Sequence, residues 1–192
     1  MRTAPESRAR ILRSSHIAAL RAARVDGAPG GRELRVTFQL LRVFKGDFQL
    51  PEGASFEVRL TRQAPTEDYT SAPAGVWSLH NVTEASRWMV FVESADAPAA
   101  ELVRDPRCRL VVPLDDALAD VELAWDIERD NADLRAALGL ARARVATLHP
   151  LAVEYLWHRY GAEATGDPAR FDGFLGLLEA PTLPVQARTA LL

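Results

Sequence analysis

Residues 33–47, ELRVTFQLLRVFKGD, decide how the first half of the chain folds. Apolar side chains alternate with polar ones from Leu34 to Leu40, which is the period of a strand with one buried face. The pattern stops at Lys-Gly-Asp, where Gly46 can adopt the positive φ of a tight turn without steric cost. We therefore predict a strand over this stretch, followed by a turn that lets the next strand run back.

Other segments of the first half carry the same signal. Alternation resumes in residues 55–62, SFEVRLTR, and three apolar runs with strand character follow. These runs are VWSLHNV at 76–82, RWMVFVES at 87–94 and CRLVVPL at 108–114. Residues 15–25, SHIAALRAARV, fit a strand or a helix, because their alanines favour helix. Five or six strands separated by turn signals predict a small antiparallel barrel or sandwich, and we favour the barrel because closure buries the sheet edges.

The spacing of apolar residues changes after Pro113. Apolar residues recur at helical spacing from Leu118 to Leu148, and Asp167 is a suitable N-cap for a later helix. Prolines at positions 150, 168 and 184 suit the first turns of further helices. The sequence thus predicts an α+β chain, with a barrel domain in residues 1–113 and a helical subdomain of four or five helices in residues 114–192.

The net charge of −3 is unevenly distributed along the chain. Residues 1–50 hold ten Arg and Lys against four Asp and Glu, whereas residues 51–192 hold 13 against 22. A basic front and an acidic back suit an anionic ligand, or two halves of one protein that attract each other. The single cysteine, Cys108, excludes an internal disulfide framework and lies in an apolar run typical of a buried side chain.

No membrane segment is evident in the sequence. No stretch approaches the roughly 18 apolar residues of a transmembrane span. The N-terminal MRTAPESRARILRSSH also lacks the apolar core of a signal peptide. We therefore expect a cytoplasmic protein without a membrane partner, the alternative being an exported precursor that was trimmed before this chain begins.

The order of the strand segments resembles that of netrin-like domains, the barrel type also found in tissue inhibitors of metalloproteinases. Residues 36–47 are similar to a strand of bacterial members that reads roughly vtFevlrvfKGd, and residues 88–92 to a later yLvFv. The resemblance covers about residues 7–112. It implies an oligonucleotide/oligosaccharide-binding type of barrel whose usual role is to bind proteins.

Two departures and one further likeness qualify what the resemblance implies. In the metalloproteinase inhibitors an N-terminal cysteine chelates the zinc of the target and disulfides clamp the domain. This chain begins MRTAPES and has no cysteine before Cys108, so inhibition of that kind is not implied. Residues 178–192 are weakly similar to the second helix of a HEAT-type repeat, with Val185, Arg188 and Leu191 at repeat-like positions.

Residue patterns for catalysis, metals and cofactors are missing from the sequence. The histidines, His16, His80, His149 and His158, do not have metal-ligand spacing, and there is no CxxC pair. Ser15-His16 and Ser78 with His80 lack a GxSxG elbow. The glycine-rich residues 27–32 lack a phosphate-loop ending, and the carboxylates between 115 and 133, Asp120 among them, scatter as on a solvated acidic helix face. We expect no enzyme activity, metal or cofactor.

Basic residues on or beside the predicted strands raise the possibility of a nucleic-acid-binding barrel. They are Arg35, Arg42, Lys45, Arg59 and Arg62. Single-stranded nucleic acid binds to barrels of this type through a basic groove and aromatic stacking platforms. However, Phe38 and Phe56 fall in the core phase, so the outward phases of these strands carry no aromatic residue. A solvated face is the simpler interpretation, and an anion-binding or nucleic-acid-binding face is the alternative.

A cluster in the helical half suggests a surface for a protein partner. It consists of Tyr155, Trp157, Arg159 and Tyr160. Two residues turn a helix by about 200°, so Tyr155 and Trp157 cannot both face inward. Aromatic residues with arginine have the composition of a binding hot spot. Docking on the chain's own barrel is the simpler explanation and the one we favour, and a partner surface is the alternative.

The patterns together favour a non-enzymatic protein–protein interaction module, an adaptor, regulator or accessory subunit. The second hypothesis is a single-stranded nucleic-acid-binding protein, and the third is an enzyme with an unfamiliar site. Self-association is a further option, because the sequence ends on the apolar residues ALL.

Overall fold

The computed structural model describes residues 10–27, 33–61, 82–92 and 109–188. The chain divides into two units, a sheet unit of Ser14–Asp115 and a helical unit of Met1–Arg13 with Asp116–Leu192. The sequence pattern placed this boundary at residue 113. In the structure the short helix α1 (Arg10–Arg13) belongs to the helical unit, where it packs against α5 (Pro150–Thr165). The sheet unit therefore interrupts the helical unit along the sequence.

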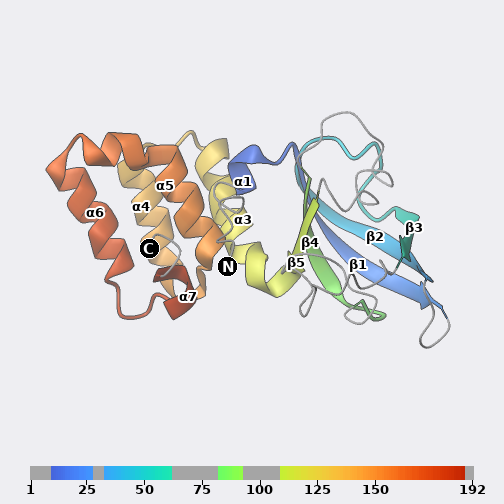
Figure 1. The fold of residues 1–192 in the computed structure, drawn as a ribbon. Helices are drawn as coiled ribbons and strands as arrows, with labels where there is room; N and C mark the ends of the chain where they lie inside the picture. The colour runs from blue at the N-terminus through green and yellow to red at the C-terminus, as the bar shows by residue number, and fades with distance from the viewer. Residues whose placement is uncertain (1–9, 28–32, 62–81, 93–108, 189–192) are drawn as a thin grey trace. The chain divides into compact units, whose positions relative to one another are not determined.

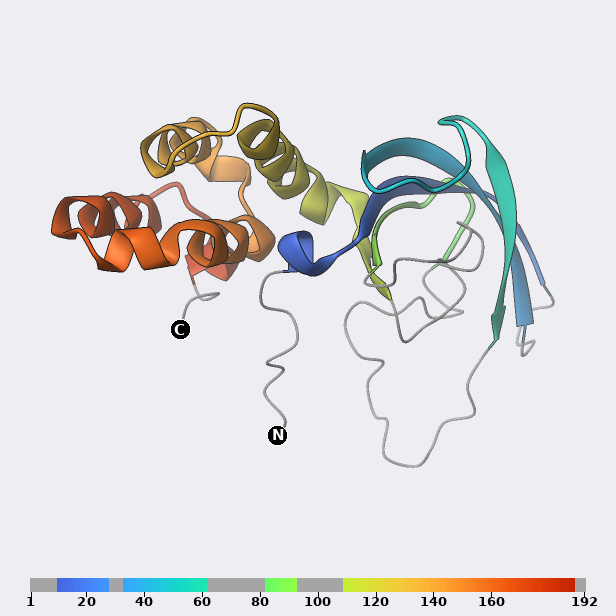
Figure 2. The same ribbon diagram turned by 90° about the horizontal axis from the view of Figure 1, so that it is seen from above.

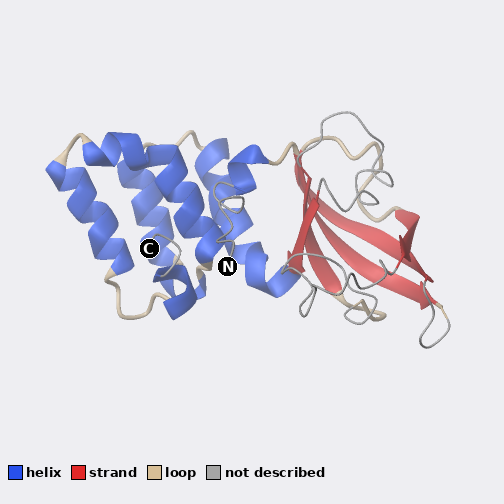
Figure 3. Cartoon of the chain, viewed as in Figure 1, coloured by secondary structure: helices blue, strands red, loops and turns tan. Residues whose placement is uncertain are grey.

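The sheet unit contains five described strands in one antiparallel sheet (Figures 1 and 3). They are β1 (His16–Asp26), β2 (Glu33–Lys45), β3 (Ser55–Thr61), β4 (Arg87–Val92) and β5 (Arg109–Pro113). The spatial order is β3-β2-β1-β4-β5. The strand predictions at these positions are confirmed, and the segment that fitted either a helix or a strand forms β1. The predicted strand at 76–82 lies outside the described residues except for Val82, which is buried.

The described strands form an open sheet, and the predicted closure into a barrel is not found among them. β3 and β5 lie at opposite edges, whereas closure requires these two strands to pair. Figure 2 shows that the sheet is strongly curled. Alternation in a sequence reports only that one face of each strand is buried, and a curled open sheet meets this requirement as a barrel does. The sequence pattern could not separate the two.

The curl has a local cause in the pairing of β1 with β2. Their register shifts at three places, between Ile17 and Ala18, between Ala19 and Leu20, and between Ala22 and Arg24. Each extra residue of a β-bulge bends its strand and increases the local twist. The pairing of β2 with β3 runs through seven residue pairs without such a shift.

The hydrophobic core of the sheet unit is formed by one face of the strands. Alternate residues of β2, such as Val36, Phe38 and Leu40, are fully buried together with Leu20 of β1 and Val90 of β4. Two of the alanines of β1, Ala18 and Ala22, also belong to this core, where side-chain burial in the sheet overrides their helical preference. The remaining members of the cluster are Phe48, Phe56, Val58, Val82, Trp88 and Val92.

The turn after β2 depends on Gly46. Its φ is +77°, and a Cβ atom at this position would lie 2.3 Å from the Cδ2 atom of His16. The Asp47 carboxylate accepts the backbone N–H of Gln49 at 2.7 Å, which closes the turn. The ring of Phe48 is buried and meets His16 edge to face at 5.4 Å. The Lys-Gly-Asp segment is thus a structural turn, as the sequence predicts.

The helical unit is an array of helices in which α5 has the most neighbours. Besides α1 and α5, it contains α3 (Leu114–Arg129), α4 (Leu134–Ala143), α6 (Pro168–Leu178), α7 (Val185–Arg188) and the 3₁₀ turn η1 (Val145–Thr147). Within this array α5 contacts α1, α4, α6 and α7, and α4 also contacts α6. Asp167 caps α6 by accepting the N–H of Ala169, as predicted. Among the described helices, none is long and apolar enough to cross a membrane.

A buried carboxylate from α3 organises the start of α5. The Asp120 side chain is fully buried and accepts the backbone N–H groups of His149 at 2.8 Å and Ala152 at 2.7 Å. His149 occupies the N-cap position but makes no capping bond with its own side chain. Asp120 therefore serves as the cap from another helix, since helix N-termini favour negative charge. The expectation that this carboxylate lies on a solvated face is wrong, because Asp120 shares the buried face of α3 with Ala117 and Ala124.

Candidate functional site

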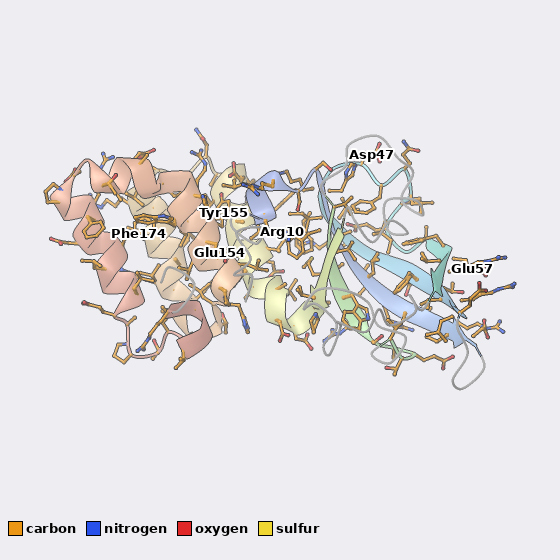
Figure 4. All side chains as sticks on the ribbon, viewed as in Figure 1. Arg10, Asp47, Glu57, Glu154, Tyr155 and Phe174 are labelled. Atoms are coloured by element: carbon orange, nitrogen blue, oxygen red, sulfur yellow. The ribbon has the colours of Figure 1, made fainter. Side chains whose placement is uncertain are left out.

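The outer face of β3, of β2 up to Gln39 and of β1 from Arg21 onward, opposite the core, is largely polar. Arg21 of β1, Arg35 of β2 and Arg59 of β3 are exposed there. Glu57 of β3, labelled in Figure 4, lies on the same face two residues from Arg59 and pairs with Thr37. Arg24 and Arg87, on the same face, each bind a neighbouring carboxylate at 2.8 Å, those of Asp26 and Asp115. In β3 and the first half of β2, face and exposure follow from alternation, because every second residue belongs to the core. β1 departs from this pattern, since its first five residues, His16–Leu20, are all buried.

Arg35 and Arg59 lie directly opposite each other on adjacent antiparallel strands. The backbone N–H of Leu40 donates to Ala54 at 2.9 Å, which fixes the hydrogen-bonding phase of the hairpin. Counting from this bond, Phe38 and Phe56 form a hydrogen-bonded pair, and Arg35 and Arg59 form a non-hydrogen-bonded pair. Side chains of such pairs approach more closely than those of hydrogen-bonded pairs, with Cα atoms about 4.5 Å apart. The two arginine side chains therefore leave the sheet side by side.

The Arg35–Arg59 pair lacks a counterion among the described residues. Neither side chain takes part in an ion pair or hydrogen bond there, whereas Arg24 and Arg87 both do. Like charges directly opposite each other on a sheet destabilise it by roughly 0.2–1 kcal/mol. Two adjacent guanidinium groups also offer the planar donor forks that suit carboxylate or phosphate. The pair is the described feature of the sheet unit best suited to hold an anion.

The other predicted basic residues do not join this pair. Arg42 and Lys45 lie farther along β2, where their pairing partners on β1 are Ala19 and Ile17. The Arg42 guanidinium stacks over the ring of Phe44, 4.6 Å from its centroid. From Arg35 to Arg42 the strand extends roughly 20 Å at its usual rise. Arg62 lies outside the described residues, so the structure brings together two of the five predicted positions.

Aromatic stacking platforms are missing from the described part of this face. Phe38 and Phe56 pack in the core with their ring centroids 6.1 Å apart, as their phase predicts. Arg21, by contrast, is an exposed member of the face that sequence reasoning missed. Its position could not be assigned because residues 15–25 fitted both a helix and a strand. The register places Arg21 opposite Gln39 on β2 and opposite Arg87 on β4.

Two of the four residues predicted to bind a partner are buried inside the helical unit. Tyr155, seen on α5 in Figure 4, donates its hydroxyl hydrogen to the Glu128 carboxylate at 2.6 Å. Burial and this bond raise the pKa of Tyr155 above its ordinary value. The hydroxyl of Tyr160 donates to the carbonyl of Ala132 at 2.5 Å, and burial raises the pKa of Tyr160. Both tyrosines connect α5 to the end of α3 and the turn that follows it.

The other two residues reach the surface of the helical unit. Arg159 lies with its Nε atom 3.6 Å from the Glu128 carboxylate and its guanidinium 5.2 Å from the centroid of the Tyr160 ring. Trp157 is half-buried and meets Phe174 of α6 edge to face at 5.7 Å. The four residues therefore do not form one continuous patch, and only Trp157 and Arg159 offer surface to a partner.

The Ser15–His16 pair has the hydrogen-bond arrangement of a structural contact. Ser15 Oγ lies 2.9 Å from His16 Nδ1 and 3.1 Å from the carbonyl of Val92 on β4. When the single hydroxyl hydrogen goes to Val92, His16 must donate to the oxygen, which is opposite to the direction needed to activate a nucleophile. The described residues also contain no group of three or more His, Cys, Asp or Glu side chains placed to hold a metal ion.

The fold and the site define an α+β protein, an antiparallel sheet followed by helices, with two exposed arginines paired on the outer face of the sheet. No protein-family model and no curated protein sequence matches the chain.

Proposed function

We propose that the protein is a non-enzymatic protein-binding module, an adaptor, regulator or accessory subunit, that recognises an anionic segment of its partner. The observation that carries the proposal is the Arg35–Arg59 pair, two exposed guanidinium groups without a counterion among the described residues. A partner carboxylate between them removes their mutual repulsion and gains charge-assisted hydrogen bonds. The netrin-like resemblance of residues 7–112 supports the same function, because such scaffolds usually bind proteins.

A protein partner is favoured over single-stranded nucleic acid on this face. Nucleic-acid strands bind to sheets of this kind through stacking as well as charge. Polar residues such as arginine, threonine and glutamate occupy the described outer phases of β2 and β3, while Phe38 and Phe56 lie in the core. Phe44, under the Arg42 guanidinium, is buried and offers no exposed ring. Glu57, two residues from Arg59 on the same face, would also repel a continuous phosphate backbone.

The helical unit offers a second surface for a protein partner. Arg159 and Trp157 are its surface members, and both come from the cluster that the sequence predicts as a hot spot. Because Tyr155 and Tyr160 are buried, their role in this proposal is to hold α5 in place.

The proposal is tested by affinity capture of the tagged full-length chain from its native cells, with and without nuclease. The variant Arg35→Glu/Arg59→Glu reverses the charge of the pair. Arg135→Glu is the matched control, because Arg135 is an exposed arginine of α4 in the other unit. We expect a partner that survives nuclease, is lost with the double variant and is kept with the control. Capture that depends on nucleic acid, or that ignores the double variant, contradicts the proposal.

A further inference from the structure

We infer that the partner segment binds in an extended form, as an added strand antiparallel to β3 along its outer edge, with an acidic side chain held by Arg59 and Arg35; this continues the antiparallel pairing of the sheet. This inference rests on the proposed function and specifies its mode. Of the described strands, β3 is an edge strand, and the arginine pair lies at that edge.

The backbone of β3 presents a regular row of hydrogen-bonding groups at this edge. Phe56 and Val58 form hydrogen-bonded pairs with β2, so their N–H and C=O groups point inward. The intervening residues, Glu57 and Arg59, form non-hydrogen-bonded pairs and point their backbone groups away from β2. Ser55 and Thr61 share their phase, which extends the row over seven residues. A peptide that pairs with this row gains main-chain hydrogen bonds independent of its sequence.

The regularity of β3 suits strand addition. Proteins commonly protect edges with bulges that twist the strand away from a neighbour. The pairing of β2 with β3 contains no register shift, whereas that of β1 with β2 contains three. An incoming strand therefore meets an even ladder at β3.

The side chains of the same residues determine which strand fits. Those with outward backbone groups, Glu57 and Arg59, also have their side chains on the outer face. A residue of the added strand that pairs with Arg59 therefore places its own side chain beside Arg59, with Arg35 on the far side of β3. An acidic residue satisfies both guanidinium groups there.

Glu57 adds a second requirement to the recognised sequence. In this antiparallel pairing, the partner residue that faces Glu57 is two positions from the one that faces Arg59. A basic residue suits that position, and the residue between the two lies on the core side of the sheet, next to Val58. The preferred segment thus alternates acidic, apolar and basic residues.

The test uses a labelled synthetic peptide, acetyl-Thr-Val-Glu-Val-Lys-Val-Thr-amide, and fluorescence anisotropy with the full-length protein. In one derivative the Glu and Lys amides are N-methylated, which removes donors that would face β3. In the matched derivative two Val amides are N-methylated, and these face away. We expect the first derivative to bind at least about tenfold more weakly than the parent, since two hydrogen bonds are lost, and the second to bind as the parent does.

A variant of the protein gives an independent measurement. Glu57→Pro removes an outward N–H without removing a bond to β2, and edge strands tolerate such prolines. We expect it to abolish peptide binding, whereas Glu57→Thr keeps the N–H and retains binding to a peptide with Thr in place of Lys. A thermal melt shows whether each variant is folded. The measurements with the methylated peptides use the unchanged protein, so they test the inference even if a variant fails to fold.

The outcomes separate the mode from the function. Binding that is lost with Arg35→Glu/Arg59→Glu but unaffected by either N-methylation overturns strand addition and leaves recognition of an anionic segment intact. Binding that ignores the arginine variants overturns the proposed function as well. Equal loss with both methylated peptides, or no binding of the parent peptide, overturns the inference.

Discussion

At the scale of single residues, Gly46 shows how backbone conformation and packing combine at one position. Its positive φ is unfavourable for any residue with a Cβ atom. In addition, such an atom would overlap the His16 ring and the carbonyl oxygen of Ser15, at 2.3 and 2.6 Å. Gly53 has a similar φ of +87° but open space around the Cβ position. The two glycines therefore allow strain and overlap to be measured separately.

We predict that Gly46→Ala lowers the free energy of unfolding of the sheet unit by about 3 kcal/mol, the sum of left-handed strain and overpacking. Gly53→Ala should cost only about 1 kcal/mol, the strain alone. The midpoint of urea unfolding, followed by tryptophan fluorescence, measures both. Equal losses for the two variants would show that the His16 contact gives way without cost.

The Tyr155–Glu128 hydrogen bond is a second feature of residue scale. A bond to a charged acceptor contributes roughly 1.5–3 kcal/mol, somewhat less where the carboxylate is half exposed, as Glu128 is. We predict that Tyr155→Phe costs about 1–2 kcal/mol. Glu128→Gln keeps an acceptor for the hydroxyl and should cost less. A double-mutant cycle between the two positions measures their coupling, and a coupling energy near zero would contradict this role.

At the scale of elements, the Asp120 carboxylate of α3, which caps the N-terminus of α5, makes the stability of the helical unit depend on pH. Burial raises the pKa of Asp120 from 3.8 to about 7, against the lowering effect of the His149 and Ala152 N–H bonds. Since the folded-state pKa lies above the ordinary value, the folded state holds this proton more tightly than the unfolded chain does. The stability contributed by Asp120 is complete below about pH 3.8 and is lost as the pH rises through about 7.

We predict that the stability difference between the natural protein and Asp120→Asn decreases as the pH rises from 4 to 7. The slope is at most about 1.4 kcal/mol per pH unit, the value of one proton. Urea unfolding of both proteins at several pH values, followed by circular dichroism at a helical wavelength, measures it. A difference that is constant or grows with pH would contradict the direction of the pKa shift. Asp120→Ala should be less stable at every pH, because it lacks the cap altogether.

At the scale of the whole molecule, the helical unit depends on a segment far from it in sequence. Ile11 of α1 is buried, and α1 packs against α5. We predict that Ile11→Ala destabilises the helical unit by about 2–4 kcal/mol, as is usual for truncation of a buried Ile. Hydrogen exchange should therefore quicken in α5 while the amides of β1 and β2 stay protected. Equal acceleration in both units would show that they unfold together.

The limits of sequence interpretation follow from particular residues. Alternation located β2 and placed Arg35 and Arg59 on one face, but it could not show that they are direct neighbours, because that depends on the register of two strands. Arg21 was missed because its segment fitted two structures. Asp120 was misplaced because the acidic composition of α3 was considered without its phase; three- and four-residue spacing from Ala117 and Ala124 is the signal that assigns it to the buried face. The netrin-like assignment and the binding function stay predictions.

Because the sheet unit interrupts the helical unit along the sequence, the parts of the helical unit are synthesised at different times. During synthesis α1 is made before the sheet unit, and its packing partner α5 starts only at Pro150. At 5–20 residues per second, the nascent chain carries α1 for roughly seven to thirty seconds before α5 exists. During that interval the sheet unit between them can fold, while Ile11 stays without its packing partner α5. α1 is therefore synthesised before the sheet unit but can pack against α5 only after the whole sheet unit has been made.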